Sequence, residues 1–173
     1  MQYSLSEAEL EPIVEFALEY YEKKEKKQTH RKGDIHFGDK RIIQAATGKI
    51  AEHAVHKLLN TTPPDYIIYQ PGQSTTEPDL KWDDYNVHVK SCNPNRCDWL
   101  ADPTTDPVVY NPAPNDVFVF CVTDDKTSTV TIKGVYLATD LIPFWVLPDS
   151  PVIAQKGKKA IHHHDIQHMA LPI

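Results

Sequence analysis

The sequence is poor in cysteine, in long apolar runs and in net positive charge. Only three of its 173 residues are cysteines, Cys92, Cys97 and Cys121, which argues against a disulfide framework and fits a reducing compartment. The apolar runs are far shorter than a bilayer requires, and no basic-then-apolar stretch resembles a secretion signal. We therefore expect a cytoplasmic protein with no membrane partner.

The charge balance limits how the protein could meet nucleic acid. The formal net charge of −6 argues against a protein that coats nucleic acid through bulk electrostatics. It leaves room for a nuclease, because carboxylates and metal ions in a cleft change the local field. With 40% hydrophobic and 24% charged residues, the chain has the composition of an ordinary globular protein and the length of a single domain, 1–173.

Two helices are expected in the first third of the chain. One covers residues 6–27, where apolar residues recur at helical spacing. Ser6 followed by Glu9 is typical of a capping box, and Pro12 predicts a kink or a later start. The other covers residues 40–60. Its predicted buried stripe consists of Ile43, Ala46, Ile50, Ala54 and Leu58.

Strands and loops are expected in the remainder. Strands are predicted over 65–70, within a hairpin at 77–92, over 116–122 and over 129–137. The segment 93–115 holds five prolines and is expected to form a long connection with a short helix near 96–101. A helix is predicted over 138–147 and an irregular tail over 148–173. The pattern indicates an α/β fold with a central mixed β-sheet flanked by helices, whose core spans 40–147.

The hairpin carries the residues with the clearest chemistry. Residues two apart in a strand point to the same face, so His88 and Lys90 share one face while the neighbouring valines are buried. Asp79 lies on the preceding strand, within reach of both. Metal-dependent cleavage of a phosphodiester needs oxygen ligands for a divalent cation and a positive charge near the reacting groups. Asp79 supplies the oxygen and Lys90 the charge.

These residues resemble a known family, the PD-(D/E)xK nuclease superfamily. The matching motifs are Pro78-Asp79 and, on the next strand, His88-Val89-Lys90. The segment Gly48-Lys49-Ile50-Ala51-Glu52 is similar to the helix that precedes the hairpin in these enzymes. The resemblance covers roughly residues 40–140, and it implies a restriction-endonuclease-like fold and metal-dependent hydrolysis of DNA with Mg²⁺ or Mn²⁺.

The resemblance also implies a role for each residue. Asp79 would be the principal metal ligand, Glu52 an acidic ligand, and the backbone carbonyl of Val89 a further ligand. Lys90 would be the catalytic lysine. His88 stands where the family usually has Asp or Glu, and imidazole binds Mg²⁺ poorly. His88 is therefore a ligand for a softer ion such as Mn²⁺, a general base, or the mark of an inactive relative.

Helical geometry places Glu52 opposite the buried stripe, facing solvent or a cleft. Considered alone, it would be one more exposed helical glutamate. The strand with His88 and Lys90 is directly followed by a loop that contains Asn93, Asn95 and Arg96. In a nuclease, a loop at this place contacts phosphate or base edges. Both asparagines also fit a polar turn. Many related nucleases form homodimers that cut both strands, so DNA and a second copy of the chain are the expected partners.

Two alternatives to an active nuclease stay open. One is a catalytically inactive module of nuclease fold that binds nucleic acid or a protein partner, which His88 in place of an acid favours. The other is a small acidic interaction protein in which the hairpin match is accidental. The run His162-His163-His164-Asp165 resembles short metal-binding tracts, which bind metal adventitiously as often as by function.

Overall fold

The protein is described by a computed structural model that places most of the chain. It describes the side chains and backbone of residues 1–20, 22, 45–67, 77–95, 98–101, 106, 108–124, 126–149 and 157–172, and the backbone alone of residues 35–44 and 107.

A five-stranded mixed sheet forms the centre of the fold. Its strands are β1 (Gln2–Ser4), β2 (Leu80–Trp82), β3 (Tyr85–Cys92), β5 (Asp116–Asp124) and β6 (Thr129–Leu137), in the order β1-β6-β5-β3-β2. The pair β3–β5 is parallel and the other pairs are antiparallel. The predicted central mixed sheet is confirmed, and the nearly continuous apolar run of β5 places it in the middle of the sheet, buried on both faces.

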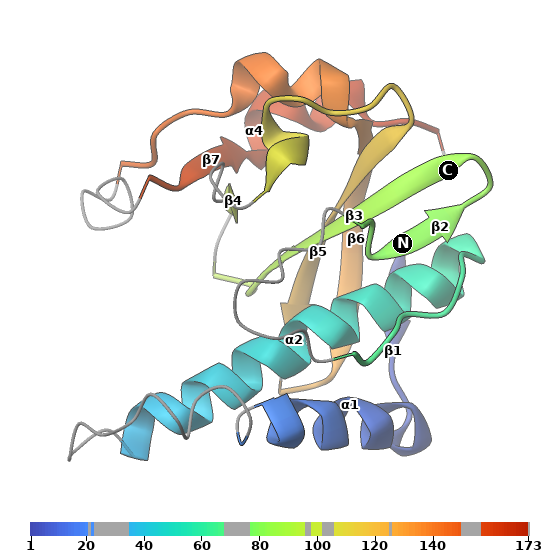
Figure 1. Cartoon of the computed structure of the whole chain (residues 1–173), viewed down its shortest axis with the longest axis vertical. Coiled ribbons are helices and arrows are strands. Elements are labelled where there is room, and N and C mark those ends of the chain that lie inside the picture. The colour runs from blue at the N-terminus through green and yellow to red at the C-terminus, as the bar shows by residue number, and fades with distance from the viewer. Residues whose placement is uncertain are drawn as a thin grey trace.

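One face of the sheet is covered by helices. The long helix α2 (Ile35–Leu59) crosses this face, and α1 (Glu7–Tyr20) packs against α2 (Figure 1). The core between α2 and the sheet is built from small and branched side chains. Its fully buried members include Ala51, Ala54, Val55, Val87, Val117, Val119, Val130 and Val135.

The opposite face is covered by short elements and a second, two-stranded sheet. These elements are β4 (Asp98–Ala101), η2 (Pro107–Val109), η3 (Ala138–Phe144), β7 (Lys159–His162), α4 (His163–Ile166) and η4 (Gln167–Met169). β4 pairs antiparallel with β7 on the side of the sheet away from α1 (Figure 1). Here the core is aromatic. Its buried members include Trp99, Phe118, Phe120, Tyr136, Leu141, Trp145 and Ile161.

The ends of both long helices follow local rules. The Glu9 carboxylate reaches back to the Ser6 backbone N–H at 2.9 Å, which confirms the predicted capping box. Pro12 lies within α1, whose described part ends at Tyr20. At the end of α2, Asn60 adopts a positive φ of 53° and the Thr61 N–H donates to the His56 carbonyl at 3.2 Å. That pattern terminates a helix by satisfying its last carbonyl groups.

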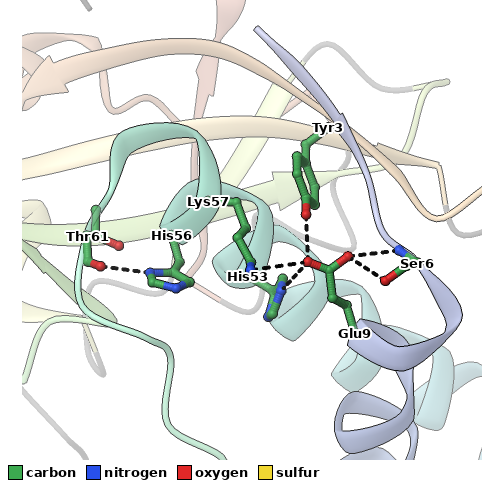
Figure 2. A network of polar contacts seen from close by, with 7 residues as sticks. All are labelled: Tyr3, Ser6, Glu9, His53, His56, Lys57 and Thr61. Carbon is green, nitrogen blue, oxygen red and sulfur yellow. Dashed lines mark hydrogen bonds and ion pairs between the residues drawn. The ribbon is translucent and has the colours of Figure 1, made fainter.

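A cluster of polar side chains fastens the N-terminal segment to α2 (Figure 2). The Tyr3 hydroxyl donates to Glu9 Oε1 at 2.6 Å, and Ser6 Oγ donates to Glu9 Oε2 at 2.8 Å. From α2, His53 Nε2 lies 3.3 Å and Lys57 Nζ 3.4 Å from Glu9 Oε1. These contacts hold the pKa of Glu9 well below its usual range, the Tyr3 hydrogen bond having the largest effect.

Four predictions of local structure were wrong in part. Residues 98–101 form strand β4 and not part of a short helix, because they pair with β7 more than fifty residues away. The tail 148–173 is not irregular, since it contains β7 and α4. The predicted helix over 138–147 is a 3₁₀ helix that ends at Phe144. Residues 65–67 form no strand, and the rest of that predicted strand lies outside the described residues.

Among the described residues, no helix has the length and apolar character that a membrane span requires.

Candidate functional site

Asp79 lies where strands β2 and β3 separate. The pairing of the two strands ends at Leu80 and Val87, one residue after Asp79. Beyond that point the Val89 N–H donates to Asp79 Oδ2 at 2.7 Å. The side chain thus occupies the open edge of β3 in place of a partner strand. The Asp79 residue is exposed at this edge.

Glu52 approaches from α2, and its surroundings differ from the prediction. It was expected to face away from the buried stripe, but only 9% of the residue is exposed. The helix is turned so that Ala51 and Val55 are fully buried, which brings the intervening Glu52 against the sheet. Lys49, one turn earlier, is 2.6 Å from Glu52 Oε2, and it lies 3.7 Å from Asp65.

The two carboxyl groups influence each other. Burial raises the pKa of Glu52 to about 8, and the charge of Asp79 adds to the rise, whereas Lys49 opposes it. The pKa of Asp79 is also raised, chiefly because protein atoms surround the carboxylate. The Val89 hydrogen bond and the charges of Lys90 and His88 oppose that effect. Because Asp79 keeps exposed surface, solvent moderates the rise.

Lys90 lies on the face of β3 opposite α2, as the alternation of the strand predicts. Its Nζ is 2.5 Å from Asp106 Oδ2 and 5.6 Å from the centre of the Phe118 ring. Val89, by contrast, packs against the core beneath α2. Lys90 therefore acts on Asp79 through its charge, across the open edge of the strand.

His88 shares the face of Lys90 but is more deeply buried. Its ring packs against Phe118 at 5.8 Å, and its Nε2 lies 3.6 Å from Asp116 Oδ1. That nitrogen has no hydrogen-bond partner among the described residues. Asp116 is already bound by the Asn86 amide at 2.8 Å and by the Ala113 N–H at 2.7 Å. His88 Nε2 is thus directed toward Asp116.

The loop after β3 is a polar turn in the part that the structure describes. Asn93 and Asn95 are exposed, and the Asn95 N–H donates to Asn93 Oδ1 at 3.1 Å. This arrangement matches the turn reading of the two asparagines. Arg96 and Cys97 lie outside the described residues.

Three charged neighbours of the site, Lys49, Asp106 and Asp116, received no role from the sequence. Lys49 had a usable signal, since it precedes Glu52 by three residues on a helix. Asp116 could be placed near His88 only by knowing that β3 and β5 pair in parallel with Asn86 opposite Asp116. Asp106 lies in the proline-rich connection, where no periodic pattern predicts its position.

The site combines two carboxylates with a nearby lysine charge, and its donor set suits a hard divalent cation. Among the described residues, no group of three or more histidine, cysteine, aspartate and glutamate side chains is arranged as a complete metal site. Any cation would therefore complete its coordination with water, backbone oxygen or substrate.

Comparison with known proteins assigns no family to this chain. No family model matches the sequence, and no curated protein or solved structure matches it significantly.

Proposed function

We propose that the protein is a metal-dependent endonuclease that hydrolyses DNA phosphodiester bonds. The observation that carries the proposal is the position of the Glu52 and Asp79 carboxylates. They come from different elements and influence each other where β2 and β3 separate, and the charge of Lys90 reaches Asp79. These are the residues whose order along the chain resembles the nuclease motif.

The chemistry of the two carboxylates fits a divalent cation. Glu52 forms an ion pair with Lys49, and the negative charge of Asp79 acts on the Glu52 carboxyl. Hard oxygen donors are the ligands that Mg²⁺ and Mn²⁺ prefer. When bound, such an ion would polarise the phosphate and lower the pKa of a coordinated water. Asp79 and Glu52 are the residues that would hold it.

Lys90 has the charge that the reaction requires. Hydrolysis of a phosphodiester builds negative charge on the phosphate oxygens, and a fixed ammonium nearby stabilises that charge. His88 faces Asp116 rather than the carboxylate pair, so we assign it no direct bond to the metal. A proton on His88 would add positive charge near Asp79 and so favour the ionised carboxylate.

Cleavage of DNA by the purified chain tests the proposal. We expect the wild-type protein to nick or linearise plasmid DNA, or to cut single-stranded DNA, with Mg²⁺ or Mn²⁺ and not in a chelator. Asp79→Asn and Lys90→Ala should abolish cleavage, whereas the exposed Asp149→Asn should leave it unchanged. A folded wild-type protein that cuts none of these substrates would overturn the enzyme, and full activity of Asp79→Asn would overturn the site.

A catalytically inactive module that binds nucleic acid or a protein is the second candidate. It is favoured by His88, which is buried against Phe118 and offers no carboxylate to the site. Metal titration separates the two functions. Divalent-ion binding that depends on Asp79 supports the enzyme, whereas nucleic-acid binding that needs no divalent ion supports the module.

A further inference from the structure

Lys90 is held by two contacts on the face of the sheet opposite α2. Its Nζ is 2.5 Å from Asp106 Oδ2 and lies 5.6 Å from the centre of the Phe118 ring. The side chains of Lys90 and Asp106 are 24% and 19% exposed, so the pair is largely shielded from water. Because a lysine is a point charge on a flexible stem, such contacts are needed to fix where its charge acts.

The segment that presents Asp106 is anchored in the core. Asp106 directly precedes the 3₁₀ helix η2, and its carbonyl accepts a hydrogen bond from the Val109 N–H at 3.1 Å. Val108 and Val109 are 6% and 2% exposed and belong to the same core cluster as Phe118. The Asp106 carboxylate thus comes from a packed turn, although it belongs to a proline-rich connection.

Because Lys90 pairs with Asp106, it does not form an ion pair with Asp79. Within the described part of the chain, the ion pair of Lys90 is with Asp106, while Asp79 Oδ2 accepts the Val89 N–H. Val89 directly precedes Lys90, so its hydrogen bond to Asp79 Oδ2 at 2.7 Å places the carboxylate and Lys90 at the same point along β3. The Asp79 oxygens are therefore not closed off by an ion pair with Lys90.

We propose that Asp106 is a positioning residue. It holds the Lys90 ammonium beside Asp79 and prevents it from pairing with Asp79 directly. This inference rests on the proposed nuclease function, and it assigns a role to the proline-rich connection between β3 and β5. Without the Asp106 charge, Lys90 would lose its fixed position and would compete with the cation for Asp79.

Steady-state cleavage by three variants tests the role. Asp106→Asn should lower kcat by about 10- to 100-fold, because small displacements of a catalytic group have effects of this size. KM for DNA should change little, and Asp106→Glu, which restores the charge on a longer arm, should recover part of kcat. Asp149→Asn, the same substitution at an exposed site outside the Lys90 ion pair, is the matched control.

Acylation of lysines, followed by mass spectrometry, tests the ion pair without relying on cleavage. We expect Lys90 to react slowly in the wild-type protein and faster in Asp106→Asn, with the exposed Lys126 and Lys133 as internal references. Unchanged reactivity of Lys90 would overturn the pairing. Unchanged kcat in Asp106→Asn beside an active wild type would overturn the positioning role and leave the nuclease intact. A wild type that cuts no DNA would remove both the proposed function and this role.

Discussion

Two glutamates have opposite electrostatic environments: Glu52, which belongs to helix α2, and Glu9, which contacts α2 from the N-terminal segment. Glu9 accepts hydrogen bonds from Tyr3 and Ser6 and has two further basic side chains within 3.4 Å, and its pKa is lowered. Glu52 is bound by Lys49 and stands near Asp79, and its pKa is raised to about 8. The same helix therefore contacts a carboxylate with many hydrogen-bond donors, that of Glu9, and carries one with few, that of Glu52.

The contrast separates stability from function. A carboxylate with many donors is stabilised in its charged form and fastens the N-terminal segment to the fold. A buried carboxylate beside a second negative charge weakens the fold at neutral pH, and such groups concentrate where a ligand binds. The Glu9 cluster is therefore interpreted as structural and the pair of Glu52 and Asp79 as the functional site.

The largest expected effect comes from removing the charge of Asp79. Asp79→Asn should reduce DNA cleavage by about 100-fold or more, since under the proposed function it removes a principal ligand of the divalent ion. The variant should stay folded, as judged by its thermal unfolding. Glu9→Gln should show the reverse pattern, with lower stability and near-normal cleavage by the folded fraction. If Asp79→Asn and Glu9→Gln lose cleavage equally and are equally stable, the Glu9 cluster and the Asp79 site do not differ in function.

The Glu52 carboxyl should make stability depend on pH in a metal-free buffer. Its folded-state pKa lies above the unfolded value, so its contribution is present below about pH 4.5 and is lost as pH rises through about 8. Relative to Glu52→Gln, the wild type should lose on the order of 5 kcal/mol of unfolding free energy across that range. Urea unfolding of both proteins at several pH values measures the difference, and parallel pH curves would contradict the raised pKa.

Replacing Glu9 should destabilise the fold with the opposite dependence on pH. Its pKa is lowered on folding, so its contribution is present above the unfolded value of about 4.5 and is lost as pH falls below it. Glu9→Gln should cost about 2 kcal/mol at pH 7, since it weakens charge-assisted hydrogen bonds. Tyr3→Phe, which removes one of these bonds, should cost less. A Glu9→Gln protein as stable as the wild type at pH 7 would show that the cluster does not fasten the helix.

The smallest effect should come from Lys57. Its side chain is 42% exposed, and its Nζ lies 3.4 Å from Glu9. An exposed ion pair of this kind contributes about 0–1 kcal/mol and is screened by salt. Lys57→Met should therefore change the unfolding free energy slightly, and less at 1 M salt than at low salt. A loss as large as that of Glu9→Gln would mean that Lys57, and not Tyr3 and Ser6, dominates the cluster.

Local patterns in the sequence predicted local structure well. The capping box of Ser6 and Glu9, the hairpin within 77–92 and the apolar strand β5 depend on neighbouring residues, and all three are present. Asp83 adopts a positive φ of 50°, which aspartate tolerates in a tight turn.

Features that depend on distant residues were not predictable in the same way. Strand β4 exists because it pairs with β7, and its own sequence carries no strong strand pattern. The burial of Glu52 depends on how α2 is rotated about its axis against the sheet. The apolar stripe predicted for this helix left that rotation uncertain by about one residue. The ion pair of Lys90 with Asp106 requires the path of a proline-rich connection.

Binding of Mn²⁺ or Mg²⁺ by calorimetry tests the central claim most directly. The account predicts that the wild type and Glu9→Gln bind a divalent ion with similar affinity, and that Asp79→Asn and Glu52→Gln bind it far more weakly. Binding that is absent in the wild type, or that persists undiminished in Asp79→Asn, would contradict the assignment of these two carboxylates to a metal site.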